Sequence, residues 1–161
     1  MSIVLSVGEI LKIAIGIERR GIAFYDVMAN SVQNVETRNV FQHLAHMEQY
    51  HIKIFQDMLD EADKYEPAQV NSEEYDAYVQ ALGENAVFTD DMITSEMATK
   101  AESDIEALEL AIGAEKDSIL FYYEMKELLP QRVHPTVNRI ITEEKSHLRQ
   151  LSELKKKLAA L

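Results

Sequence analysis

The sequence predicts an all-α protein in which four long helices form a bundle. Over four stretches, apolar residues recur at steps of three and four, which is the period of a helix with one buried face. Hydrophobic residues make up 47% of the 161 residues, and only 5 are Gly and 3 are Pro. So few turn-forming residues do not suit a protein built from many short strands. We therefore expect one all-α domain over residues 1–161, large enough to bury a core without disulfides.

The first two helices are predicted over residues 6–30 and 34–64. Ser6 and Glu9 match the capping-box pattern, in which two side chains satisfy free backbone N–H groups at a helix N-terminus. The link at residues 31–33 is short, and short links join neighbouring helices that run in opposite directions. The first half of the chain should therefore form an antiparallel hairpin.

The last two helices are predicted over residues 103–129 and 135–159. Ser103 and Glu106 repeat the capping-box pattern, and Pro130 ends the third helix because it lacks the N–H that would continue it. This pair should form a second antiparallel hairpin. The connector between the hairpins is long enough to run back along the bundle, and its segment SEEYDAYVQAL could form a short helix. The expected fold is two hairpins joined by one long crossover.

The two hairpins also repeat one sequence pattern. The segment AIGIERRGIAFY at residues 14–25 matches AIGAEKDSILFY at residues 111–122, with an offset of 97. A Glu-x-x-His motif at residues 48–51 matches a second one at residues 144–147, with an offset of 96. Two copies at such a long spacing indicate internal pseudo-symmetry rather than a solenoid of short repeats.

Each predicted helix places ionisable residues on its apolar face, near its middle. Burying an unpaired charge costs several kcal/mol, so these residues need partners. Two divalent cations would balance the four carboxylates, and oxygen and nitrogen donors suit first-row transition metals. Because residues three apart share a helix face, the Glu and His of each motif can reach the same ion. The predicted metal ligands are Glu18, Glu48, His51, Glu115, Glu144 and His147.

Two tyrosines stand at matching positions in the two halves. Tyr25 and Tyr122 each follow a ligand candidate, Glu18 or Glu115, by two helical turns on the same face. One interpretation is that they only pack in the core. The other is that their hydroxyls hydrogen-bond the ligand carboxylates or relay an electron.

Other ionisable residues close to the motifs are predicted to have no part in the site. Glu143 adjoins Glu144 but points about 100° away around the helix, so we expect it to be a solvated surface charge. His43, His46 and His134 have no partner at ligand spacing. They are expected to lie at the surface or to cap helix ends.

Charge and composition exclude several classes of function. The formal net charge of −12 disfavours nucleic acid and anionic membrane surfaces as partners, because both are polyanions. With no Cys, the chain has no disulfide, thiolate metal site or cysteine nucleophile. No stretch is apolar enough for a membrane span and no cleavage site follows the N-terminal segment, so a cytoplasmic protein is expected.

The six ligand candidates, the Phe-Tyr pair after each single Glu and the ending EEKSHL resemble the rubrerythrin-like branch of the ferritin-like superfamily. The resemblance covers essentially the whole chain. It implies a ferritin-like four-helix bundle with two iron ions that react with oxygen or hydrogen peroxide, manganese and zinc being alternative metals. In that arrangement Glu18 and Glu115 are terminal ligands, Glu48 and Glu144 bridge the ions, and one His completes each ion's shell.

Two departures from rubrerythrins bear on the expected activity. No rubredoxin domain with paired cysteines is present, so a separate protein is expected to donate electrons. Rubrerythrins also carry an extra ligand Glu three residues after the one that matches Glu115, and here that residue is Ser118. The chain also resembles bacterioferritins, which oxidise and store iron, but too few residues follow His147 for their fifth helix. An oxidoreductase acting as a homodimer is therefore the first hypothesis, with iron oxidation and storage, or a structural metal site, as alternatives.

Overall fold

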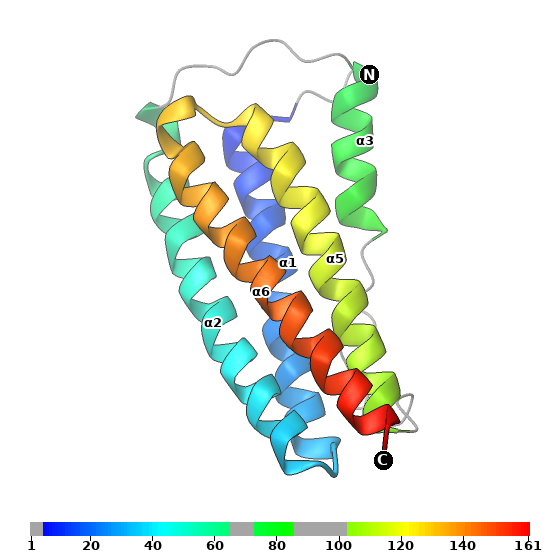
Figure 1. The fold of residues 1–161 in the computed structure, drawn as a ribbon. Helices are drawn as coiled ribbons and strands as arrows, with labels where there is room; N and C mark the ends of the chain where they lie inside the picture. Colours follow the sequence, from blue (N-terminus) through cyan, green and yellow to red (C-terminus); the bar gives the residue numbers. More distant parts are fainter. Residues whose placement is uncertain (1–4, 65–72, 86–102) are drawn as a thin grey trace.

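The computed structural model describes residues 5–64, 73–85 and 103–161, in which four long helices run side by side (Figure 1). No strand occurs within these ranges. The long helices are α1 (Val7–Ser31), α2 (Val35–Asp60), α5 (Asp104–Leu128) and α6 (His134–Ala159), and a shorter helix is α3 (Glu73–Glu84). Two 3₁₀ turns lie at Ala62–Lys64 and Gln131–Val133. The predicted all-α four-helix bundle is confirmed.

The helix starts follow from the predicted caps. The Ser6 hydroxyl accepts the N–H of Glu9 at 3.1 Å, and the Glu9 carboxylate accepts the N–H of Ser6 at 2.9 Å, which completes the capping box. At the start of α5, the Ser103 hydroxyl accepts the N–H of Glu106 at 3.2 Å. The second helix ends earlier than predicted: α2 stops at Asp60, and the chain tightens into a 3₁₀ turn, which is common at helix ends.

The crossover gives the bundle its topology. Helices α1 and α2 form one antiparallel hairpin and α5 and α6 form the other, while α2 and α5 run in the same direction (Figure 1). The Asp104 carboxylate anchors the start of α5 to the first hairpin, because it accepts the N–H groups of Gln33 at 3.0 Å and Asn34 at 2.7 Å. Residues 65–72 and 86–102 of the connector lie outside the described residues.

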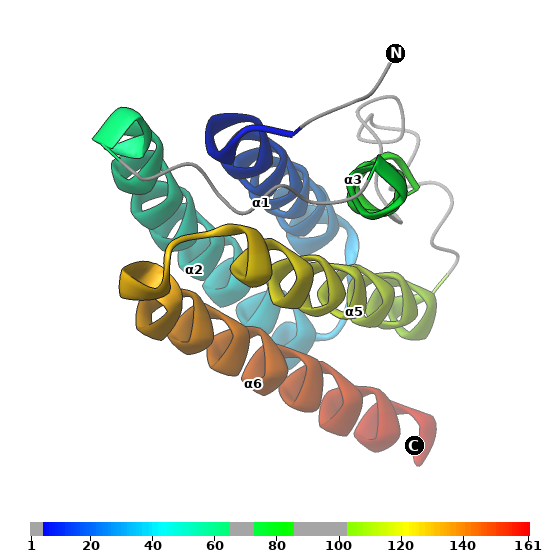
Figure 2. The same cartoon turned by 90° about the horizontal axis from the view of Figure 1, so that it is seen from above.

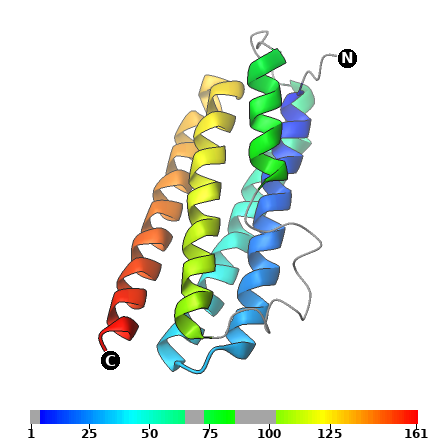
Figure 3. The same ribbon diagram turned by 90° about the vertical axis from the view of Figure 1, so that its right-hand side faces the viewer.

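The short helix predicted in the connector is α3. It lies outside the bundle, beside α1 and α5 (Figures 2 and 3). On this helix Val79 is fully buried, and the Tyr75 hydroxyl donates to the Glu124 carboxylate of α5 at 2.7 Å. None of the described helices is long and apolar enough to cross a membrane.

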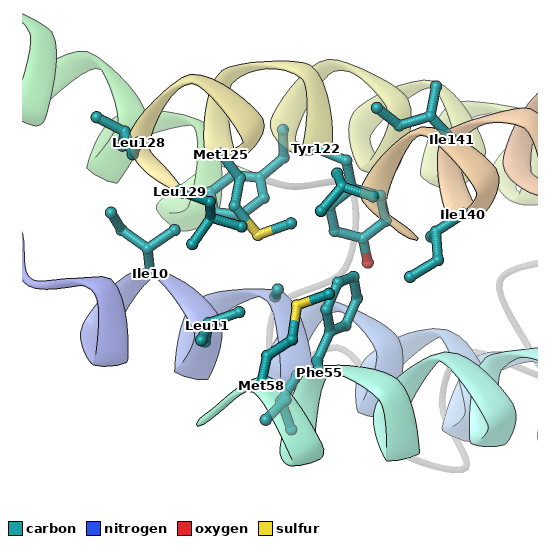
Figure 4. Packing of buried hydrophobic residues seen from close by; sticks show 14 of the residues in the cluster. Ile10, Leu11, Phe55, Met58, Tyr122, Met125, Leu128, Leu129, Ile140 and Ile141 are labelled. Atoms are coloured by element: carbon teal, nitrogen blue, oxygen red, sulfur yellow. The ribbon is translucent and has the colours of Figure 1, made fainter. Parts of the chain in front are cut away.

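Buried apolar side chains form two clusters, one towards each end of the bundle. Figure 4 shows the first, which includes Leu11, Phe55, Met125 and Ile140. The second includes Phe24, Phe41, Leu108 and Leu151. Burying each such side chain contributes about 1.5–3 kcal/mol, so the two clusters together stabilise the bundle. Between the two clusters, at the middle of every long helix, lie the ionisable residues of the repeat.

Candidate metal centre

The six predicted ligands lie together in the layer between the two apolar clusters. Each comes from near the middle of a helix about 38 Å long, and antiparallel packing brings these midpoints to one level. The exposed fraction of each residue is 4% or less. The residues of the layer are Glu18 on α1, Glu48 and His51 on α2, Glu115 on α5, and Glu144 and His147 on α6.

The side chains form two overlapping groups. In each group, one potential ligand atom per residue lies within 4.8 Å of the others. The first group, which we call the His51 position, contains Glu18, Glu48, His51 and Glu144. The second group, the His147 position, contains Glu48, Glu115, Glu144 and His147. Glu48 and Glu144 belong to both groups, which is the arrangement that bridging carboxylates require.

Both imidazole rings turn the same nitrogen towards the carboxylates. His51 Nδ1 lies 3.2 Å from Glu144, 3.3 Å from Glu48 and 3.6 Å from Glu18. His147 Nδ1 lies 3.0 Å from Glu144 and 3.8 Å from both Glu48 and Glu115. The two rings are stacked, with centroids 6.0 Å apart. Six donor groups thus converge on one small volume.

The layer fits a pair of cations better than it fits a set of paired side chains. Glu115 Oε2 and Glu144 Oε1 are buried and accept no well-aligned hydrogen bond from the described residues; their nearest imidazole nitrogens are His147 Nδ1 at 3.8 Å and His51 Nδ1 at 3.2 Å. An unsatisfied buried group costs about 1–3 kcal/mol, and more if it is charged. A metal ion beside each atom would remove that cost, and carboxylate and imidazole donors suit divalent first-row metals.

Burial and mutual repulsion shift the pKa values of the carboxyl groups in the metal-free layer. Burial, followed by the charges of Glu48 and Glu144, raises the pKa of Glu18 and of Glu115 well above 4.5. For Glu144 burial acts in the same direction, but hydrogen bonds from both histidines outweigh it and lower the pKa. Without metal, burial and neighbouring carboxylates therefore favour the protonated forms of Glu18 and Glu115.

The pKa values of the two histidines are also raised, which for an imidazole favours the charged form. Burial alone lowers the pKa of an imidazole, but hydrogen bonds to Glu115 and Glu144 raise the pKa of His147 to about 10. Hydrogen bonds to Glu144, Glu18 and Glu48 likewise raise the pKa of His51. The carboxylates therefore favour the protonated form of both rings in the metal-free protein, and a metal bound at Nδ1 would have to displace a proton.

Metal binding is therefore expected to release protons. Cations displace those held by His51, His147, Glu18 and Glu115, so more than one proton should leave for each pair of divalent ions, and affinity should rise with pH. Titration calorimetry in buffers of different ionisation enthalpy measures this number directly. Equal heats in all buffers would contradict the expectation.

The two tyrosines connect the halves of the layer. The Tyr25 hydroxyl donates to Glu115 at 2.5 Å, and the Tyr122 hydroxyl donates to Glu18. Each tyrosine thus holds the single Glu of the other half. Burial and the neighbouring carboxylates raise the pKa of both phenols, so they remain donors. Of the two interpretations from sequence, the hydrogen-bonding one describes the structure.

Replacing either tyrosine with phenylalanine should weaken the metal site without changing its ligands. Outer groups that orient ligands typically contribute 10- to 100-fold to metal affinity. We expect a loss of about 10-fold in Tyr122→Phe, and a lower melting temperature of the metal-free protein, because Glu18 loses its donor. Cobalt titration and thermal unfolding measure the two effects. Wild-type affinity in both Tyr25→Phe and Tyr122→Phe would show that the hydroxyls do not support the site.

The prediction for Glu143 was wrong. This residue is only 28% exposed at its side chain, and its carboxylate lies 2.7 Å from Nε2 of His51. The 100° rotation from Glu144 turns it towards α2 rather than into water, and the long side chain reaches across to the neighbouring helix. The sequence signal for this role is only a carboxylate directly before Glu144; the packing of α6 against α2 is what places it beside His51.

The other three histidines lie outside the layer, as expected. His43 and His46 are exposed on α2. His134 Nε2 lies 2.8 Å from the carbonyl oxygen of Leu129 at the C-terminal end of α5, where a free carbonyl needs a partner.

A small cavity opens onto the layer between α1 and α5. Its lining includes Glu18, Glu48 and Glu115, together with Gly21 and Ser118. The open volume is about 20 Å³, close to the room that one water molecule needs. Small residues at the matching positions 21 and 118 leave this space, because Ser118 turns its hydroxyl back to the carbonyl oxygen of Ala114 at 3.1 Å.

This fold and this layer define the class of the ferritin-like carboxylate proteins, in which two helices each supply a Glu and two others each supply Glu-x-x-His. The sequence matches the model of the Rubrerythrin family over residues 9–155, so the chain belongs to this family. A crystal structure of a ferritin-like diiron-carboxylate protein from Thermotoga maritima is similar, with a TM-score of 0.68 and 34% sequence identity. That match covers 94% of this chain and 95% of the other. No curated protein matches the sequence.

Proposed function

We propose that the protein is an oxidoreductase that holds two iron ions in this layer and uses them to reduce hydrogen peroxide or oxygen. The observation that carries the proposal is the pair of ligand groups that share Glu48 and Glu144. A shared pair of carboxylates suits two cations held close together rather than one. The Thermotoga protein, which is described as a diiron-carboxylate protein, supports iron as the metal.

The side chains have separate tasks in this proposal. Glu18 with His51 and Glu115 with His147 would each hold one ion, and Glu48 and Glu144 would bridge both. Two bound ferrous ions would supply one electron each, and these two electrons with two protons from water would convert one hydrogen peroxide into two waters. The tyrosine hydroxyls keep the terminal carboxylates in place, and the apolar clusters on either side exclude bulk water.

The cavity beside the layer suits a very small substrate. The volume of about 20 Å³ beside Glu18, Glu48 and Glu115 has room for a molecule about the size of water, and hydrogen peroxide and oxygen are among the smallest oxidants. No side chain of the described site is placed as a nucleophile, so chemistry at the open positions of the metals is sufficient. We further propose that a separate protein donates the electrons and that the protein acts as a cytoplasmic homodimer.

Stopped-flow absorbance of the protein loaded anaerobically with ferrous iron tests the function. We expect oxidation by hydrogen peroxide to be fast and to restore two ferric ions per chain without mineral growth. Zinc-loaded protein and the variant Glu144→Ala, given the same iron, are controls for reaction of free iron.

The alternatives predict different traces. Faster oxidation by oxygen than by peroxide, with continued iron uptake, would favour iron oxidation and storage. Two ferrous ions that bind but react with neither oxidant would indicate a structural metal site. Either result would overturn the proposed reduction of peroxide.

A further inference from the structure

The two metal positions are related by the internal repeat, but their surroundings are not equal. Nε2 of His51 lies 2.7 Å from the Glu143 carboxylate. Nε2 of His147 has no hydrogen-bond partner among the described residues. The residue that matches Glu143 in the first motif, at the offset of 96, is Met47, which offers no acceptor comparable to a carboxylate.

The position of Glu143 around α6 explains why its carboxylate reaches the ring of His51. Glu143 precedes Glu144 on α6 and faces α2, where His51 lies with its Nδ1 towards the metal layer and its Nε2 away from it. An imidazole that donates from Nε2 keeps the lone pair of Nδ1 for a metal, and a carboxylate acceptor also makes that nitrogen a stronger ligand. Among the residues that the structure describes, the His147 ring is oriented by its Nδ1 contacts with the carboxylates and by stacking on His51.

We propose that Glu143 is a positioning residue that makes the two metal positions unequal, so that the His51 position binds divalent cations more tightly than the His147 position. This inference rests on the proposed dinuclear centre and adds an order of filling to it. Outer carboxylates that orient a histidine contribute about 10- to 100-fold to metal affinity. A difference of that size lets one ion remain bound when the second is lost.

Single-position variants separate the effect of Glu143 from repulsion between two bound ions. Glu115→Ala removes a ligand of the His147 position only, and Glu18→Ala removes a ligand of the His51 position only. Glu143→Met gives α6 the residue that α2 carries, and Glu143→Gln keeps an oxygen that can accept from Nε2. Met47→Glu is the reverse exchange. Circular dichroism checks that each variant is folded.

Titration with cobalt(II), followed by calorimetry and by its visible absorption, is the test. In the Glu115→Ala background, Glu143→Met should lower cobalt affinity about 10- to 100-fold and Glu143→Gln should recover part of the loss. In the Glu18→Ala background, Glu143→Met should change nothing. Met47→Glu should strengthen the His147 position in that background.

A spectroscopic measurement distinguishes orientation of the ring from general support of the fold. In zinc-loaded protein, the Nε2 proton of His51 should be visible by nitrogen-proton NMR of labelled histidine and protected from exchange, and Glu143→Met should remove that signal. Equal cobalt affinity with and without Glu143→Met in the Glu115→Ala background would overturn the inference alone. Absence of cobalt binding to the wild-type protein would overturn the proposed centre as well.

Discussion

Replacing Glu144 with alanine should remove tight metal binding at both positions of the layer. Glu144 belongs to both ligand groups and is fully buried, so its loss takes one donor from each ion. Loss of an outer partner alone costs 10- to 100-fold in affinity, and loss of a direct ligand should cost at least about 100-fold at each position. Titration calorimetry with ferrous or cobalt ions under anaerobic conditions measures affinity and stoichiometry together.

The matched control for this variant is Glu18→Ala. Glu18 belongs to one group only, so the variant should still bind one ion per chain at the His147 position. Glu48→Ala should behave like Glu144→Ala, because Glu48 is also shared. If Glu144→Ala kept one tight ion, as Glu18→Ala is expected to do, the shared role of Glu144 would be wrong.

The double variant Glu18→Gln with Glu115→Gln should be more stable than the wild-type protein without metal at pH 7. Burial and neighbouring carboxylates disfavour ionisation of Glu18 and Glu115 in the metal-free layer, whereas both groups ionise freely in the unfolded chain at pH 7. Two glutamines remove this cost. Each glutamine keeps a carbonyl oxygen that can accept from Tyr122 or Tyr25. We expect a gain of about 1–4 kcal/mol, the range found when buried ion pairs are replaced by uncharged residues. At this size the gain corresponds to about 2–4 °C in melting temperature per kcal/mol.

The stability difference between the double variant and the wild-type protein should depend on pH. In the unfolded chain both carboxyl groups ionise near pH 4.5, whereas in the folded protein their pKa values are raised well above it. Their effect on the wild-type protein is therefore a loss of stability that begins as pH rises through about 4.5 and is absent below it. The melting temperatures of the double variant and of metal-free wild type should therefore differ at pH 7 and converge at acidic pH. A double variant less stable than metal-free wild type at pH 7 would contradict the expectation.

Added metal should make the wild-type protein more stable than the double variant. Ligand present at 100 to 1,000 times its dissociation constant stabilises a folded protein by about 3–4 kcal/mol. Wild type should gain this from added metal, and the double variant should gain little because each position has lost a charged ligand. The acids of the layer thus cost stability in the metal-free protein and become favourable only with cations.

Much of the fold and site could be predicted from the sequence because both follow local rules that repeat. The helix period, the Ser6 and Ser103 caps and the proline at residue 130 define the hairpins, and the tight links leave few ways to pack them. The ligand candidates stood out because they interrupt apolar stripes at matching positions. Neither step required knowing how far one helix is rotated against the next.

What could not be predicted depends on contacts between helices. The helix period places Glu143 about 100° from Glu144, but only the packing of α6 against α2 shows that this direction leads to His51. In the same way, the spacing places Tyr25 above Glu18, yet its hydroxyl reaches Glu115 of the other half. The early end of α2 has no proline or glycine signal, because a 3₁₀ turn continues the chain with only a small change in backbone angles.

Anomalous scattering from crystals grown with iron or manganese tests the central claim most directly, namely that this bundle buries four acids in order to hold two cations. The expected result is two anomalous peaks per chain in the layer between the apolar clusters, with Glu48 and Glu144 contacting both ions and His51 and His147 contacting one each. A metal-loaded crystal without density in this layer, or with ions bound only at surface carboxylates, would contradict the claim.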